Sequence, residues 1–185
     1  HGIAVAAQGV PTTLIISLVA VLAGLIIGLF IAIAKMSKHR ILRGIATVYV
    51  DVLRGTPLMV QVLILAYGLP QLLKSNFGIQ LNWTHFIIVG FIACGINSSA
   101  YMAEIIRSGL QAVDIGQTEA ARSLGMSSRM TMRYVIVPQA FKIIVPAMGN
   151  EFIALIKETS ILSVVGIVEV TRQGTLWASS SCLSF

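Results

Sequence analysis

A long stretch without charge near the start of the chain decides what kind of protein this sequence can form. No charged residue occurs between Gly2 and Ala34, and residues 14–34 are apolar almost throughout. As a helix rising about 1.5 Å per residue, residues 14–34 would extend about 30 Å, the thickness of the hydrocarbon core of a bilayer. The chain is 56% hydrophobic and 11% charged, whereas soluble domains carry roughly 25% charged residues. The sequence therefore predicts a membrane protein.

Further apolar stretches follow the first and are separated by polar segments. The fold class that we predict is an all-α membrane protein, a multi-span helical bundle that forms a single transmembrane domain over residues 1–185. The expected spans are about 12–34, 56–73, 86–106 and 134–156.

Small residues and prolines within the spans predict how the helices pack and bend. Gly24 and Gly28 have the four-residue spacing that lets helices approach closely in lipid. The fourth span contains Pro138, Pro146 and the pair Gly149-Asn150. We expect a kinked or interrupted helix there, of the kind that exposes backbone groups to a cavity in transporters.

The distribution of charge predicts the orientation of the chain. A basic cluster directly follows the first span and consists of Lys35, Lys38, His39, Arg40 and Arg43. Such clusters lie on the cytoplasmic side, so we expect the N-terminus outside. The formal net charge of +6 sits in loops beside apolar spans, which favours membrane lipid rather than nucleic acid as its partner.

The segments that join the spans give further expectations. Residues 41–54 alternate apolar and polar faces at helical spacing, which predicts an amphipathic helix at the cytoplasmic interface that runs into the second span. Asp51 and Arg54 lie three residues apart and can pair there, as interfacial anchors. Residues 70–84 read as an outer loop, and Cys94 as a small core hydrophobe.

A polar loop over residues 108–133 carries the most specific motif. Glu119-Ala120-Ala121 is followed at fixed offsets by Gly125 and Pro138. The pattern indicates a short helix outside the bilayer, a turn and a return into the membrane. It resembles the signature of permease subunits of bacterial ABC importers, with Val135 and Val137 in place of the family's Ile and Leu. Residues 54–57 with Gln61, and residues 150–160, resemble the branch that takes up polar amino acids.

The resemblance implies a fold, partners and a location. It implies the type I permease fold of ABC importers, in the bacterial cytoplasmic (inner) membrane, with this loop as the coupling helix that docks on an ATPase subunit. It also implies a second permease chain, identical or a paralogue, and an extracytoplasmic solute-binding protein. The residues implied to couple to the ATPase are Glu119, Ala120, Ala121, Gly125 and Pro138. We expect Glu119 to cap the short helix or to pair with a basic residue of the ATPase.

Polar residues inside the third and fourth spans are the candidates for the substrate pathway, since polar groups at that depth face protein or a cavity. An acid could meet the ammonium of an amino acid, and Lys157 or free backbone N–H groups could meet its carboxylate. Each residue could equally bond a neighbouring helix or a partner subunit. The candidates are Asn97, Ser98, Tyr101, Glu104, Asn150, Glu151, Lys157, Glu158 and Thr159.

Other kinds of chemistry have no support in the sequence. No phosphate-binding Gly-x4-Gly-Lys-Ser/Thr motif occurs, so this chain is not expected to be an enzyme, and ATP and Mg would be bound by the ATPase subunit. His1, His39 and His85 are scattered and predict no metal site. No cofactor is expected in this chain.

The end of the chain departs from the family pattern. The family has a further complete crossing after about residue 174, whereas residues 171–185 are too short to span, so we expect a fragment or an altered end. The function predicted is the transmembrane subunit of an ATP-driven amino acid importer that works by alternating access. The alternatives are a permease for another small solute, such as an opine or a sulfur compound, and a channel or anchor without an ATPase. The sequence leaves open which amino acid is carried.

Overall fold

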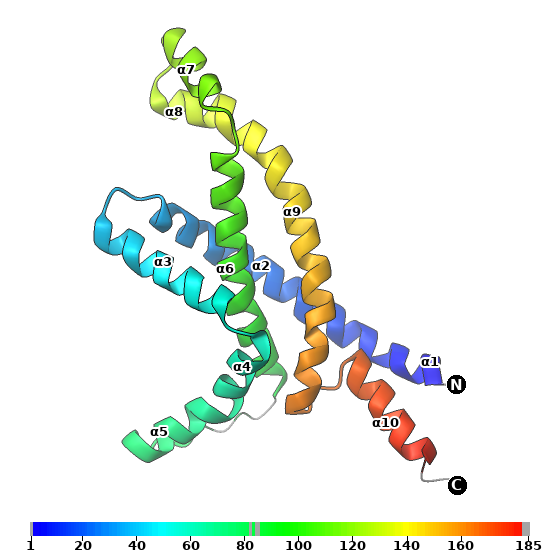
Figure 1. Cartoon of the computed structure of the whole chain (residues 1–185). Coiled ribbons are helices and arrows are strands. Elements are labelled where there is room, and N and C mark those ends of the chain that lie inside the picture. The colour runs from blue at the N-terminus through cyan, green and yellow to red at the C-terminus, as the bar shows by residue number, and fades with distance from the viewer. Residues whose placement is uncertain (1, 82, 84–85, 183–185) are drawn as a thin grey trace.

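A computed structural model describes residues 2–81, 83 and 86–182 of the chain. All regular elements of these residues are helical, which confirms the all-α prediction (Figure 1). In the first half these are α1 (Gly2–Ala6), η1 (Ala7–Gly9), α2 (Val10–Lys35), α3 (Arg40–Gly55), α4 (Leu58–Leu63), η2 (Ile64–Gly68) and α5 (Leu69–Phe77). In the second half they are α6 (Ile87–Gln111), α7 (Ile115–Ser123), α8 (Ser128–Thr131), η3 (Met132–Ile136), α9 (Val137–Glu158), η4 (Thr159–Val165) and α10 (Val170–Cys182).

Four of the continuous helical stretches within the described residues are long and apolar enough to cross a bilayer. They are Gly2–Lys35, Leu58–Phe77, Ile87–Gln111 and Ser128–Val165. Helix α6 is the most buried of them and lies at the centre of the bundle, with α2, α3, α4 and α9 packed around it (Figure 1). The elements that surround α6 therefore determine which polar residues meet in the interior.

Glycines allow α2 and α6 to approach closely, as the sequence predicted. A methyl group added at Gly24 would lie 2.7 Å from the Ser98 hydroxyl, and one added at Gly28 would lie 2.7 Å from Cβ of Met102. Real Cβ atoms do not approach so closely, so side chains at these two positions would force the helices apart.

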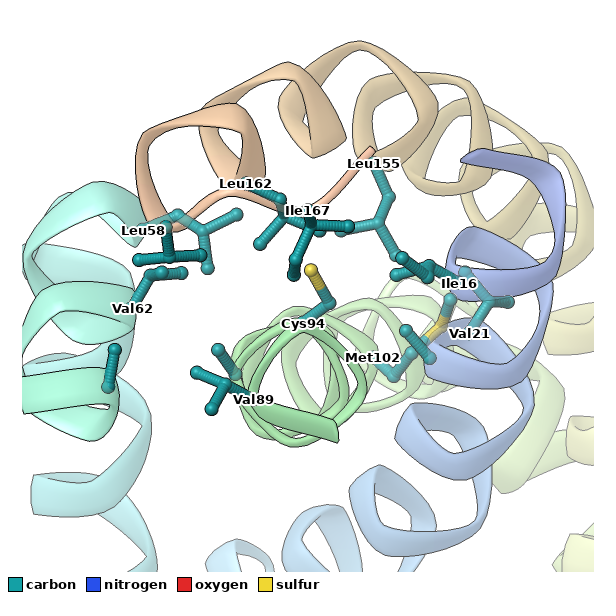
Figure 2. Packing of buried hydrophobic residues seen from close by; sticks show 14 residues of the cluster. Ile16, Val21, Leu58, Val62, Val89, Cys94, Met102, Leu155, Leu162 and Ile167 are labelled. Atoms are coloured by element: carbon teal, nitrogen blue, oxygen red, sulfur yellow. The ribbon is translucent and has the colours of Figure 1, made fainter. Parts of the chain in front are cut away.

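The larger apolar core forms where α6 meets α2, α4, the end of α9 and η4. Figure 2 shows Cys94 of α6 directed toward Ile167, with Leu155 and Leu162 beside it and Ile16 of α2 farther along. Cys94 is fully buried and is a free cysteine. Its predicted place in an apolar core is confirmed; the side chain of Cys182 lies outside the described residues.

Helix α3 corrects one expectation. Its second half packs against α2 and the middle of α6, where Tyr49 Oη lies 2.7 Å from Ser99 Oγ. The predicted pair of Asp51 and Arg54 does not form. Asp51 lies 3.8 Å from Lys35 Nζ instead, and the Arg54 guanidinium lies 5.2 Å from the centre of the Tyr101 ring. Asp51 and Arg54 each contact a residue of another helix, because tertiary packing brings these partners closer than the two side chains lie to each other.

The expected outer loop is shorter than predicted. Residues 70–77 are helical, because α5 continues the helix of α4 and η2 before ending at Gly78. Gly78 adopts φ +66° and its N–H bonds the Lys74 carbonyl at 3.1 Å, a helix end that glycine favours. Residues 82, 84 and 85, and with them the His85 of the sequence analysis, lie outside the described residues, as does His1.

The fourth apolar helix is not interrupted. It begins at Ser128, where the Ser127 hydroxyl accepts from the Met130 N–H at 3.3 Å, and α9 runs unbroken through Pro146 and Asn150. The disturbance lies earlier, in the wider π turn of η3 directly before Pro138. The same arrangement occurs in η2 directly before Pro70. A proline lacks the N–H for an α-helical bond and crowds the preceding turn, so a wider turn relieves the conflict without breaking the helix.

After α9 the chain tightens into η4 and turns at Gly166, which has φ +84°. Glu169, which the sequence analysis did not single out, is 1% exposed, and its carboxylate accepts from the Thr171 and Arg172 N–H groups at 2.8 Å each. The buried acid thereby caps the start of α10.

Candidate functional site

A polar pocket of about 420 Å³ lies beside the middle of α6. Its walls come from the end of α3, the break between α3 and α4, the middle of α6 and the junction of α9 with η4. The lining residues, which we call the polar pocket, are Arg54, Gly55, Thr56, Pro57, Leu58, Asn97, Tyr101, Glu158 and Ile161.

The break between α3 and α4 exists because Thr56 and Pro57 adopt extended backbone angles. Proline disfavours a helical conformation in the residue before it, so α3 ends there. Gln61 closes the break: its amide donates to the Leu53 carbonyl at 2.8 Å and to the Thr56 hydroxyl at 2.9 Å. These bonds satisfy acceptors that the end of a helix leaves free.

The same glutamine joins the break to α6. Asn97, 3% exposed, donates from Nδ2 to the Gln61 Oε1 at 3.2 Å. The bond fixes the Asn97 side chain at the wall of the pocket. Asn97 therefore combines two of the roles that the sequence left open: it bonds a neighbouring helix, and it lines a cavity.

Opposite charges face the pocket without neutralising each other. Arg54 is exposed on the pocket side of α3 and stacks over the Tyr101 ring, a cation–π arrangement. Glu158 lines the pocket from the end of α9. Among the described residues, neither Arg54 nor Glu158 forms an ion pair within 4.0 Å. A guanidinium and a carboxylate on one cavity are suited to a solute that carries both an anionic and a cationic group.

The structure brings together three of the predicted substrate candidates: Asn97, Tyr101 and Glu158 all line the pocket. Ser98 points away toward Gly24 of α2, and its buried hydroxyl has no hydrogen-bond partner among the described residues. Thr159 is fully buried and donates to the Ile156 carbonyl at 2.7 Å, which turns α9 into η4.

The remaining candidates lie outside the lining of the pocket. Glu151 is half-buried, whereas Asn150 and Lys157 are exposed. Glu104 belongs to a separate group of charges, the ion cluster, which consists of Lys35, Asp51, Glu104 and Arg107. Their roles in a substrate pathway stay predictions.

The ion cluster lies nearer the end of α6 that leads to α7. Lys35 Nζ lies 3.1 Å from Glu104 Oε2 and 3.8 Å from Asp51 Oδ1, and the Arg107 guanidinium bonds both oxygens of Glu104. The side chains of Lys35 and Glu104 are only 14% and 18% exposed. The cluster joins α2, α3 and α6.

The predicted coupling loop forms a compact unit beyond the end of α6 (Figure 1). Helix α7 starts at Ile115 and is capped by Asp114, whose side chain accepts from the Gly116 N–H at 2.6 Å. The expectation that Glu119 caps this helix is wrong, because Asp114 does so and Glu119 lies in the middle of α7, exposed. Ala120 is also exposed, whereas Ala121 is buried against its own unit.

Gly125 ends α7 in the left-handed conformation, with φ +81°. The Met126 N–H reaches back to the Ala121 carbonyl at 3.1 Å, and the Arg122 guanidinium donates to the Met126 carbonyl at 3.0 Å. A side chain at Gly125 would oppose this backbone angle. Pro138 follows the π turn of η3, which accommodates the missing N–H within the continuous helix.

The loop exposes large apolar side chains. Ile115 is 74% exposed and Leu124 is 84% exposed, at the two ends of α7. Between them lie the exposed Glu119 and Ala120. This apolar surface with one acid is suited to a protein partner.

Sequence reasoning missed Arg54, Thr56 and Gln61 as parts of the site. Arg54 was interpreted as an interfacial anchor because charges at the ends of apolar spans usually lie at the membrane surface. The available signal was the Thr-Pro pair in an otherwise helical pattern, which predicts a helix break and hence free backbone groups.

The chain is similar to known transport proteins over most of its length. Residues 24–182 match the family described as binding-protein-dependent transport system inner membrane component. The arginine transport system permease protein ArtQ of Bacillus subtilis is 43% identical over 90% of this chain and 73% of its own length. The nopaline transport system permease protein NocM of Agrobacterium fabrum is 39% identical over 88% of this chain and 68% of its own length.

A solved structure is similar over nearly the whole chain. A chain from the crystal structure of an amino acid ABC transporter with histidines superposes with a TM-score of 0.86 and 47% identity, over 96% of this chain and 79% of the other. Both the family match and the identities cover well over half of the sequence. The chain belongs to the family of inner membrane components of binding-protein-dependent transport systems.

Proposed function

We propose that this chain is the transmembrane subunit of an ATP-driven importer of amino acids, with the polar pocket as a contact site for the solute. The observation that carries the proposal is the pair of opposite charges, Arg54 and Glu158, which line a cavity beside the middle of α6 and form no ion pair within 4.0 Å among the described residues. An amino acid presents a carboxylate to the first and an ammonium to the second. The names of similar permeases, for arginine and for amino acids, support this class of solute.

In this proposal the chain moves but does not hydrolyse ATP. Helix α7, with Glu119, Ala120, Ala121 and Gly125, docks on a separate ATPase subunit, which binds ATP and Mg. Because α7 is tied to the start of the α9 helix by the Gln139–Gln117 side-chain bond of 3.1 Å, movement of α7 is transmitted to α9 and so to Glu158 at its far end. A second permease chain and an extracytoplasmic solute-binding protein complete the importer.

The membrane topology follows from the same arrangement. The basic segment after α2 and the α7 unit lie on the cytoplasmic side of a bacterial inner membrane, and the N-terminus lies outside. The proposed spans are about 12–34, 56–73, 86–106 and 134–156, with the coupling loop over 108–133 and the single domain over 1–185. The four apolar helices support this path of the chain.

Reconstituted import tests the proposal through Gly125. We expect Gly125→Asp to abolish ATP-driven import of labelled amino acids into proteoliposomes while the chain still inserts, because a side chain strains the backbone at φ +81° and the aspartate adds a negative charge to the docking surface. Gly44→Ala is the matched control, since Gly44 lies within α3 in open space and alanine is favoured in a helix. Normal import by the Gly125→Asp complex would contradict the role of α7.

One observation favours a second solute class. The nopaline permease is 39% identical to this chain, close to the identity of the arginine permease. An opine would carry the same two kinds of charge into the polar pocket. Uptake of a panel containing amino acids, opines and sulfur compounds by the full complex separates these solutes. Family membership disfavours the remaining alternative, a channel or anchor without an ATPase, and co-purification of an ATPase subunit tests it directly.

A further inference from the structure

A second hollow, distinct from the polar pocket, lies between α2 and α3. It has a volume of about 650 Å³, and we call it the α2–α3 groove. Its lining includes Ile27, Phe30, Ala34, Leu42, Ile45 and Tyr49, with Ser37 at the loop end. Phe30 and Ile45 are 67% and 65% exposed, so the groove opens to the outside of the chain rather than to its core.

The length of the groove matches one leaflet of a bilayer. Along α2 it extends from Ile27 to the end of the helix at Lys35, about 12 Å at about 1.5 Å per residue, and it continues to Ser37 in the turn that follows. The hydrocarbon core of a bilayer is about 30 Å thick, so the groove covers about half of it. At the deep end the Tyr49 hydroxyl is already bonded to Ser99 Oγ at 2.7 Å. An occupant therefore meets apolar side chains and needs no polar group at that end.

The other end of the groove is basic. Lys38, His39, Arg40 and Arg43 surround the turn beside Ser37 and Leu42, and all four side chains are exposed. No acidic residue occurs between residues 36 and 50. Within the described part of the chain, Lys38, Arg40 and Arg43 form no ion pair within 4.0 Å. Lys35 differs, because Glu104 and Asp51 hold its ammonium inside the bundle.

We propose that the α2–α3 groove binds an anionic phospholipid of the cytoplasmic leaflet, with an acyl chain along Ile27–Ala34 and the phosphate against Lys38, Arg40 and Arg43. An acyl chain of one leaflet fits the length of the groove, and the unneutralised basic residues at its mouth complement an anionic headgroup. The N-terminus of α3 adds to this, since His39 provides no side-chain cap for its free N–H groups. The inference rests on the membrane topology proposed above.

Native mass spectrometry of the complete transport complex tests this site. The complex is purified from vesicles of phosphatidylcholine and phosphatidylglycerol with identical acyl chains, and the lipids retained after mild delipidation are counted. We expect Arg40→Gln with Arg43→Gln to lower retained phosphatidylglycerol about 10-fold and to leave phosphatidylcholine unchanged. Lys74→Gln with Lys142→Gln removes the same charge elsewhere and is expected to change neither lipid.

A second variant tests the groove without changing charge. Ala34→Phe fills the wall of the groove and is expected to lower phosphatidylglycerol retention to a similar degree, whereas Ala178→Phe on the exposed face of α10 is the matched control. The lipid site would be overturned if the variants retained as much phosphatidylglycerol as the unmodified complex, or if the controls lost as much as the variants. A disulfide between two permease copies that carry Ile45→Cys would also overturn it, because a second chain would then cover the groove. Amino acid uptake by the unmodified complex is measured separately, so failure of the proposed function is distinguished from failure of the lipid site.

Discussion

The ion cluster and the polar pocket lie on the same helix but treat their charges differently. Tyr101 and Glu104 are three residues apart on α6, about 4.5 Å along its axis. In the ion cluster Glu104 meets both Lys35, at 3.1 Å, and Arg107. In the polar pocket Arg54 and Glu158 face a cavity without an ion pair among the described residues.

The difference separates a structural from a functional use of charge. A charge held inside a helical bundle costs free energy unless a partner offsets its loss of water. The ion cluster meets this requirement within the chain, so it fixes α2, α3 and α6 relative to one another. In the polar pocket, water or a solute must supply the partner for each charge, and a site of this kind can bind a solute reversibly.

The largest effect is expected from breaking the ion cluster. Glu104→Ala leaves Lys35, whose side chain is 14% exposed, with only Asp51 at 3.8 Å. Removing one partner of a buried pair costs 3–5 kcal/mol, and we expect about 3 kcal/mol in the free energy of unfolding here because the pair is partly exposed. Denaturant titration in detergent micelles measures it. The double variant Lys35→Met, Glu104→Leu removes the unpaired ammonium and is expected to recover part of the loss, because Arg107 still lacks Glu104. A double variant as unstable as Glu104→Ala would show that the unpaired charge of Lys35 is not the reason.

A substitution in the polar pocket should affect uptake strongly and stability little, the reverse of the ion cluster. Arg54→Gln removes a charge that has no ion-pair partner within the described residues, so we expect less than about 1 kcal/mol of lost stability. Uptake of labelled amino acid should fall about 10-fold or more, because the carboxylate of the solute loses a charge-assisted hydrogen bond. Lys142→Gln, an exposed cation on α9, is the control for net charge. Undiminished uptake by Arg54→Gln would remove Arg54 from the solute site.

A conservative change sharpens the comparison within the ion cluster. Arg107 bonds both oxygens of Glu104 through its Nε atom, at 3.1 Å each, and also bonds Gln111. A lysine keeps the charge but loses the planar fork, so we expect Arg107→Lys to cost about 1 kcal/mol in the free energy of unfolding. Thermal melting of the purified complex checks this value, with Arg129→Lys in the exposed α7–α8 unit as the unaffected reference.

The smallest effect is expected at the ring that supports Arg54. Tyr101→Phe retains the aromatic face and should leave both stability and uptake nearly unchanged, whereas Tyr101→Leu removes the cation–π contact, worth about 0.5–1 kcal/mol at a partly exposed site. We expect Tyr101→Leu to raise the solute concentration for half-maximal uptake by about threefold through less precise placement of Arg54. Equal behaviour of the two variants would show that the ring face is unimportant and only its volume matters.

Local features of the fold followed from the sequence because their physical causes are local. The charge-free run before Lys35 and the turn at Gly125 each depend on residues close in sequence. The spacing of Gly24 and Gly28 predicted close helix packing, but their contacts with Ser98 and Met102 of α6 are tertiary. The start of α7 also has a local signal, because aspartate is favoured as a helix cap and Asp114 directly precedes Ile115.

The composition of the polar pocket could be predicted only in part. Asn97 and Tyr101 were candidates because polar residues inside an apolar span must face protein or a cavity. Arg54 and Glu158 are 104 positions apart in the numbering (158 minus 54), and nothing in either neighbourhood indicates that they share a pocket. Glu104 was a candidate for the same reason as Glu158, an acidic residue near the end of an apolar span, but the structure places it in ion pairs.

The sequence by itself determined that this chain is a membrane-spanning helical bundle with a polar α7 loop, because hydropathy and backbone preference act along the chain. Only the tertiary structure decided which charges neutralise each other and which face a cavity. That choice depends on the angle at which α3 crosses α6 and on the position of the break at Thr56 and Pro57, which bring residues from distant parts of the chain within a few ångströms. Electrostatic pairing is decided by such distances and by exclusion of water, and neither is written in the order of the residues.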